Sequence, residues 1–74
     1  MVITKEKAAQ LVQSLDEVKK YLVTVPNAII EFDHESKDKT VWVIHVYEAK
    51  DGHTATFNWF DVNKQSGQII KEFN

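Results

Sequence analysis

A tight hairpin near the middle of the chain is the sequence feature that most restricts its fold. Residues 40–48, with the sequence TVWVIHVYE, are rich in β-branched and aromatic residues, which favour strands. A second β-rich run covers residues 53–62, and the segment between the two runs ends in Asp51-Gly52, a pair typical of two-residue hairpin turns. The sequence therefore predicts an antiparallel hairpin, and the rest of the fold must be compatible with it.

The residues before the hairpin predict one helix over residues 5–23. Thr4 is a suitable N-cap, because its hydroxyl can accept a hydrogen bond from the free N–H groups of the first turn. Apolar residues then recur at spacings of three and four, which places them on one face of a helix. They are Ala8, Leu11, Val12, Leu15, Val18 and Leu22. Pro26 ends the helical pattern, because the residue before a proline favours extended geometry.

Two further strands are expected on either side of the hairpin. Residues 28–34 are rich in strand formers, and the polar residues 35–39 after them favour a turn. Residues 63–67 predict another turn, after which residues 68–73 form a short last strand. The connections are short, as in an antiparallel meander. The expected fold class is α+β: one N-terminal helix packed on one face of an antiparallel β-sheet of three to four strands, in a single domain over residues 1–74.

The alternation of side chains along the hairpin separates two faces of the sheet. One face should be apolar and pack on the helix; it carries Trp42, Ile44, Val46, Ala55, Phe57 and Trp59. The other face is mixed; it carries Val41, Val43, His45, Tyr47, Thr54, Thr56, Asn58, Phe60 and Val62. This assignment requires uninterrupted pairing, since a β-bulge would shift part of one strand.

The mixed face is the candidate partner-binding surface, because a single helix cannot cover both faces of a sheet. Its candidate contact residues are Val43, His45, Tyr47, Asn58 and Phe60. Grouped apolar and aromatic residues on an uncovered face are typical of protein interfaces. The same residues would also be explained by strand propensity alone, or by burial in a homodimer.

No residue pattern in the chain indicates catalysis or cofactor binding. The sequence has no cysteine, which excludes thiolate nucleophiles and thiolate metal ligands. His34, His45 and His53 share no metal-ligand spacing, and Ser36 and Ser66 lie in polar turns without a nucleophile-elbow sequence. We therefore expect no catalytic, metal-binding or cofactor-binding residue, and no enzyme.

The charge distribution argues against a nucleic-acid partner. The formal net charge is −2, and the basic residues are nine dispersed lysines with no arginine. Phosphate backbones require a basic patch, which the sequence does not show. Neither a membrane-spanning segment nor a signal peptide is expected in this chain, because no long apolar run occurs in it.

The segment after the second hairpin strand contains a recognisable turn motif. Asp61 and Asn63 can bond back to the backbone of the turn, Ser66 is a common turn residue, and Gly67 can supply a positive φ angle. We expect these four residues to be structural, with Ile69 returning the chain to a strand.

Three elements together make the chain resemble the PepSY family. They are the Ile-Thr-x-Glu-x-Ala helix start, the Val-Trp-Val-Ile-His-Val strand at residues 41–46, and the Asp-x-Asn-x-x-Ser-Gly-x-Ile ending. The ending has one residue more than the tightest form of the family motif. The resemblance implies a small α+β module without catalytic residues that binds a protein or peptide, including a peptidase that it regulates or inhibits.

The same resemblance suggests a secreted or cell-envelope location, although the sequence itself leaves the compartment open. The alternative is a small structural or accessory domain of a larger bacterial or phage protein. A homodimer is compatible with both interpretations.

Overall fold

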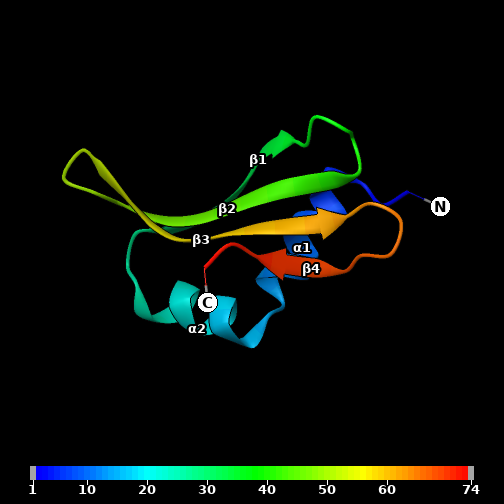
Figure 1. The fold of residues 1–74 in the computed structure, drawn as a ribbon. Coiled ribbons are helices and arrows are strands. Elements are labelled where there is room, and N and C mark those ends of the chain that lie inside the picture. The colour runs from blue at the N-terminus through cyan, green and yellow to red at the C-terminus, as the bar shows by residue number, and fades with distance from the viewer. Residues whose placement is uncertain (1, 74) are drawn as a thin grey trace.

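The computed structural model describes residues 2–73, which form two helices followed by four strands (Figure 1). The elements are α1 (Lys5–Gln13), α2 (Asp16–Thr24), β1 (Ala28–Glu35), β2 (Val41–Lys50), β3 (His53–Asn63) and β4 (Ile69–Lys71). The strands form one antiparallel sheet in the order β1-β2-β3-β4. The predicted α+β class is thus confirmed, with four strands in a meander.

The helical segment is two helices, where the sequence predicted one over residues 5–23. The Ser14 hydroxyl donates a 2.7 Å hydrogen bond to the carbonyl oxygen of Gln10 and so competes for the backbone at the end of α1. Leu15 then takes an extended conformation, with ψ 137°, and becomes the N-cap of α2. The start of α1 is as expected, since the Thr4 Oγ1 accepts a 3.1 Å hydrogen bond from the Lys7 N–H.

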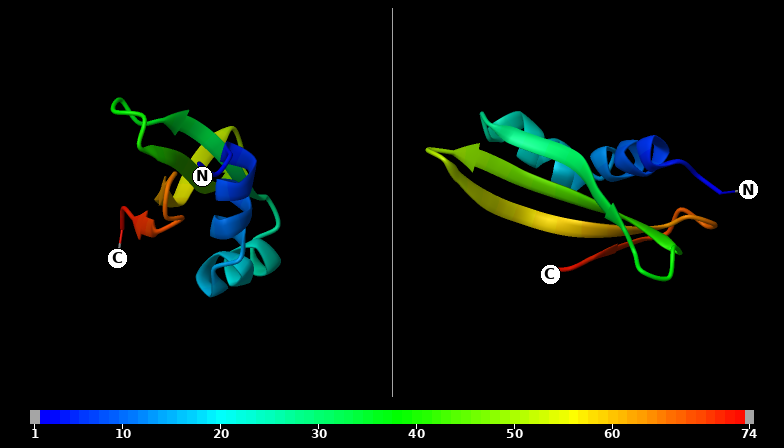
Figure 2. Two further views of the ribbon diagram at one scale, coloured as in Figure 1. Left: turned by 90° about the vertical axis from the view of Figure 1, so that its right-hand side faces the viewer. Right: turned by 90° about the horizontal axis from the view of Figure 1, so that it is seen from above.

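Both helices lie on the same face of the sheet, and within residues 2–73 no helix covers the other face (Figure 2). The fully buried core residues come from both layers: Ala8, Val12, Val18, Ile44, Val46, Phe60 and Val62. The apolar helix residues predicted from their spacing are all in this core or packed against it. Burial of these side chains is the main stabilising contribution in a chain of this size.

A β-bulge interrupts the pairing of the central hairpin. Pairing is regular from the turn as far as Tyr47 opposite Thr56, but the next residue of β2, Val46, pairs with Asn58. Phe57 is therefore an extra residue in β3. Because side chains alternate along a strand, one extra residue moves every later position of β3 to the face opposite the one expected.

The bulge corrects part of the face assignment. Phe60 and Val62, expected on the mixed face, are 0% exposed and belong to the core between sheet and helices. Asn58 lies on this helix-facing side as well. Trp59, expected against the helix, lies on the opposite face, where its ring stacks on His45. Residues of β2 keep their expected faces, because the bulge is in β3.

The end of the β2–β3 hairpin extends beyond the two helices (Figure 1). Asp51 and Gly52 form its two-residue turn with φ angles of 52° and 77°, as the Asp-Gly pair predicts. No helix within residues 2–73 has the length and hydropathy needed to cross a membrane.

Candidate functional site

The sheet face opposite the helices, here called the open face, is the candidate functional surface. The pairing of the strands assigns its residues. They are Ile29, Glu31 and His34 of β1, Val41, Val43, His45 and Tyr47 of β2, Thr56, Trp59 and Asp61 of β3, and Ile70 of β4. The face therefore combines aromatic, aliphatic and acidic side chains.

Three stacked rings cross the open face from β2 to β3. The His45 ring stacks on Trp59 with a centroid distance of 3.7 Å and an interplanar angle of 2°. The Tyr47 ring stacks on His45 at 4.4 Å and 25°. Because each ring is held by its neighbour, the stack is a rigid feature that costs little conformational entropy when a partner binds.

His45 is the central ring of this stack and is only 7% exposed. Its Nε2 lies 2.9 Å from the Thr56 hydroxyl, which satisfies one polar atom of the ring. Burial lowers the pKa of His45, and the nearby carboxylates of Asp33 and Glu31 oppose this shift in part. The neutral imidazole is thus favoured in the folded protein.

Tyr47 joins the stack to the carboxylate at the edge strand. Its hydroxyl donates a 3.0 Å hydrogen bond to Glu31 Oε1. This bond, with the negative charge of Glu31, raises the pKa of Tyr47. The Tyr47 hydroxyl is consequently a hydrogen-bond donor throughout the physiological pH range.

A groove of about 510 Å³ lies on the open face beside Trp59. Val41, Val43 and Trp59 provide apolar surface, and Asp61, Glu72 and Phe73 complete it near the end of the chain. This volume is within the range of pockets that bind small molecules.

Apolar side chains are also exposed next to the groove. Ile70 is 64% exposed and Phe73 is 50% exposed. Ile70 pairs with Asp61 and Phe73 lines the groove, so both lie at the β4 side of the open face. The groove therefore has an apolar margin that water covers in the free domain.

The structure brings together only part of the predicted contact set. Val43, His45 and Tyr47 share the open face. Asn58 and Phe60 do not, because the bulge moves them to the helix-facing side, and the expectation that they contact a partner there is corrected. The Asn58 side chain instead donates to the backbone oxygen of Phe73 and accepts from its N–H, both at 2.9 Å.

Alternation of side chains alone could not identify the residues that occupy the open face in place of Asn58 and Phe60. Trp59 and Asp61 were hidden by the bulge, and Glu72 and Phe73 reach the groove because Asn58 fixes the end of the chain. The relevant feature of the sequence is that the apolar residues at positions 57, 59, 60 and 62 do not keep to one face of a regularly alternating strand.

The turn after β3 is organised by Asn63. Its side-chain oxygen accepts hydrogen bonds from the N–H groups of Gln65 at 2.8 Å and Ser66 at 3.0 Å. Gly67 has a φ of 77°, and its N–H donates to the Asn63 carbonyl at 2.8 Å. Asp61, grouped with these residues by the sequence, instead lies within β3 and faces the groove.

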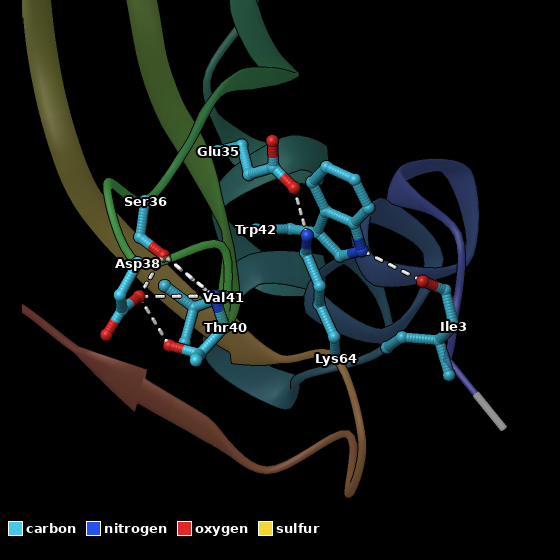
Figure 3. Close-up of polar contacts among 8 residues, drawn as sticks. All are labelled: Ile3, Glu35, Ser36, Asp38, Thr40, Val41, Trp42 and Lys64. Atoms are coloured by element: carbon cyan, nitrogen blue, oxygen red, sulfur yellow. Dashed lines mark hydrogen bonds and ion pairs between the residues drawn. The ribbon is translucent and has the colours of Figure 1, made fainter.

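A polar cluster lies on the helix side of the sheet (Figure 3). Lys64 Nζ forms an ion pair with Glu35 and lies 4.0 Å from the centroid of the Trp42 ring. Trp42 Nε1 donates a 2.9 Å hydrogen bond to the Ile3 carbonyl. These contacts join the N-terminal segment, β1, β2 and the β3–β4 turn, so the cluster has a structural explanation.

The β1–β2 loop at one end of the groove is held by its own side chains (Figure 3). Asp38 Oδ1 accepts hydrogen bonds from the hydroxyls of Thr40 at 2.7 Å and Ser36 at 2.8 Å. These bonds lower the pKa of Asp38. The conformation of the loop is therefore supported by its own side chains.

No three or more histidine, aspartate or glutamate side chains converge as a metal site within residues 2–73. His34 bonds to the neighbouring Asp33 at 2.6 Å, and His53 is exposed at the end of the hairpin. The described structure thus contains a surface with stacked rings and carboxylates.

Comparison with known proteins identifies the fold. Neither the protein-family models nor the curated proteins give a match. A solved structure matches with a TM-score of 0.72 and 17% sequence identity, over 92% of this chain and 59% of that chain. It is the structure of a type VI secretion system effector-immunity complex from Pseudomonas protegens. The likeness establishes a shared fold, and this chain spans well under two thirds of the matched one.

Proposed function

We propose that this domain is a non-catalytic module that binds a protein partner through its open face. The observation that carries the proposal is the Tyr47–His45–Trp59 stack beside a groove, on the sheet face opposite the two helices. Rigid aromatic anchors next to exposed apolar residues are the features that dominate protein interfaces.

The matched structure supports the same class of function. Its description names an effector-immunity complex, which is an assembly of two proteins that bind each other. We propose an effector–immunity partnership as the specific form of binding, in which this domain and a secreted effector associate. The low identity means that the support comes from the shared fold and not from shared contact residues.

Regulation of a peptidase is the second candidate. It rests on the resemblance to the PepSY family and on the turn motif, whose Asn63 and Gly67 close the β3–β4 connection. No comparison tests membership of that family, so it stays a prediction. Both candidates require a protein partner, and the identity of that partner separates them.

Site-specific photo-crosslinking in cells of the native host tests the proposal. A photoreactive phenylalanine analogue would replace Ile70, which is 64% exposed at the open face, or Val23, which is 85% exposed on α2. We expect a crosslinked protein from position 70 and none from position 23, identified by mass spectrometry. Crosslinks from position 23 alone would contradict binding through the open face.

A second variant checks that the contact is specific. Ile70→Asp places a charge on a side chain that the fold leaves exposed, so the free energy of unfolding should change by less than about 0.5 kcal/mol. Binding of the identified partner should fall at least tenfold. An effector or a peptidase as the crosslinked protein would decide between the two candidate functions.

A further inference from the structure

We infer that the groove on the open face binds an arginine side chain that projects from the protein partner. The inference rests on the proposed function and specifies the chemistry of the partner at the contact. It follows from the charge of the open face, the ring that walls the groove, and the composition of this chain.

The open face is acidic although the chain as a whole is close to neutral. Glu31, Asp33, Asp61 and Glu72 lie on or beside it, whereas the basic side chains that line the groove are Lys37 and His34, of which His34 bonds to Asp33. Two other lysines lie on the helix side of the sheet, where Lys64 pairs with Glu35 and Lys71 pairs with Glu17. A surface of this charge favours a basic partner surface and repels an acidic one.

Asp61 is the carboxylate best placed to select a cation. It is half-buried within β3, faces the groove and forms no ion pair within residues 2–73. Glu72 lines the same groove. Two carboxylates at one groove supply acceptors for a planar group that donates several hydrogen bonds.

The wall of the groove favours arginine over lysine. Trp59 presents one ring face to His45 at 3.7 Å, so a cation would bind the opposite face. A guanidinium stacks on an aromatic ring and bonds carboxylates in its plane at the same time, whereas a hydrated ammonium group stacks poorly. Phe73 and Val43 offer apolar contact to the stem of the side chain.

A second copy of these 74 residues cannot supply the occupant. The sequence has nine lysines and no arginine. The arginine would therefore come from outside these 74 residues, which agrees with a partnership between unlike chains.

Nuclear magnetic resonance with a defined probe tests the inference. The probe is the blocked peptide acetyl-Gly-Ala-Arg-Ala-Gly-amide, and its control carries citrulline, which keeps the shape and loses the charge. The two tryptophan indole N–H signals report separately, because Trp59 lines the groove and Trp42 Nε1 bonds to Ile3 on the helix side. We expect the arginine peptide to shift the Trp59 signal saturably, at least tenfold more tightly than the citrulline peptide, with no shift at Trp42.

A matched pair of charge-neutralising variants completes the experiment. Asp61→Asn should weaken binding of the arginine peptide at least fivefold. Glu17→Gln removes the same charge from the exposed helix side and should leave binding unchanged. An unaltered Trp42 signal verifies the fold of each variant. Equal binding of the arginine and citrulline peptides by the unmodified domain would overturn the inference without reference to any variant.

The crosslinking experiment and the peptide titration can give negative results independently of each other. If position 70 crosslinks to a protein but the arginine peptide leaves Trp59 unshifted, the open face binds its partner by other chemistry and the inference is wrong. If the peptide binds as expected but position 70 captures no protein, the arginine site stands and the proposed function is wrong.

Discussion

His45 links the stability of this domain to pH, because it is buried in the aromatic stack. Burial lowers its pKa, so the folded state binds a proton less readily than the unfolded state, whose histidine titrates near pH 6.5. The contribution of neutral His45 to the free energy of unfolding is fully present above about pH 6.5. It is lost as the pH falls through the lower pKa that His45 has in the folded state. We expect the free energy of unfolding to decrease from pH 7.5 to pH 5, measured by urea denaturation, and His45→Gln to reduce that decrease.

The exposed His53 provides the control for this prediction. His53→Gln makes the same substitution at an exposed position at the end of the hairpin, away from the aromatic stack. If His45→Gln and the unmodified domain lose the same stability between the two pH values, the buried ring is not the group responsible.

Lys64 should contribute to stability more than a surface lysine. It is 8% exposed, pairs with Glu35, and lies 4.0 Å from the Trp42 ring centroid. Lys64→Met keeps the apolar stem but removes the cation, and we expect a loss of about 1–2 kcal/mol in the free energy of unfolding. The matched change Lys71→Met removes an exposed pair with Glu17 and should cost less than about 0.5 kcal/mol. Equal losses for the two variants would contradict the role of the Trp42 contact.

At the scale of elements, the features that were predicted correctly are those that depend on the local sequence pattern. The four strands, the Asp51-Gly52 turn and the Thr4 cap follow from residues near each other in the chain. Two features did not follow. The helix breaks at Ser14-Leu15 although both residues tolerate helical geometry, because the Ser14 hydroxyl bonds back to the Gln10 carbonyl and Leu15 takes an extended conformation.

The β-bulge is the second feature, and it determines which residues form the candidate site. Alternation fixes the face of a residue only relative to its neighbours, so one unrecognised insertion reverses the assignment of the rest of the strand. Trp59 and Asp61 were therefore missed, while Asn58 and Phe60 were assigned to the wrong face. Val43, His45 and Tyr47 were placed on the open face, because β2 has no insertion of its own.

Deletion of Phe57 should remove the bulge without reversing the core. With this residue absent, Tyr47–Thr56 and Val46–Asn58 become consecutive pairs in a regular hairpin. The deletion does remove the ring that stacks on Tyr21 at 4.3 Å, so we expect a folded protein that is about 2–4 kcal/mol less stable by urea denaturation.

The substitution Phe57→Ala separates the ring from the backbone insertion. It removes the same ring but keeps the bulge, so its stability should be within about 1 kcal/mol of the deletion variant. A deletion variant that fails to fold while Phe57→Ala folds would show that the bulge itself is required by the sheet.

At the scale of the whole molecule, the two-layer arrangement gives the faces of the sheet different roles. The helices and the inner face hold the fully buried side chains, so they determine stability. The open face contributes less burial and carries the rings and carboxylates that a partner can contact. Substitutions should therefore separate into those that change stability and those that change binding.

The charge of the open face also bears on self-association. In a two-fold dimer formed through this face, the acidic surface that carries Asp61, Glu72 and Glu31 would meet the same acidic surface of the other copy, and like charges in an interface are unfavourable. We expect a monomer of 8.6 kDa by sedimentation equilibrium at low ionic strength. The double variant Asp61→Asn, Glu72→Gln should self-associate more strongly than the unmodified domain, because it keeps the exposed Ile70 and Phe73 but loses two charges. A stable dimer of the unmodified domain whose dissociation constant is independent of salt would contradict this account of the face.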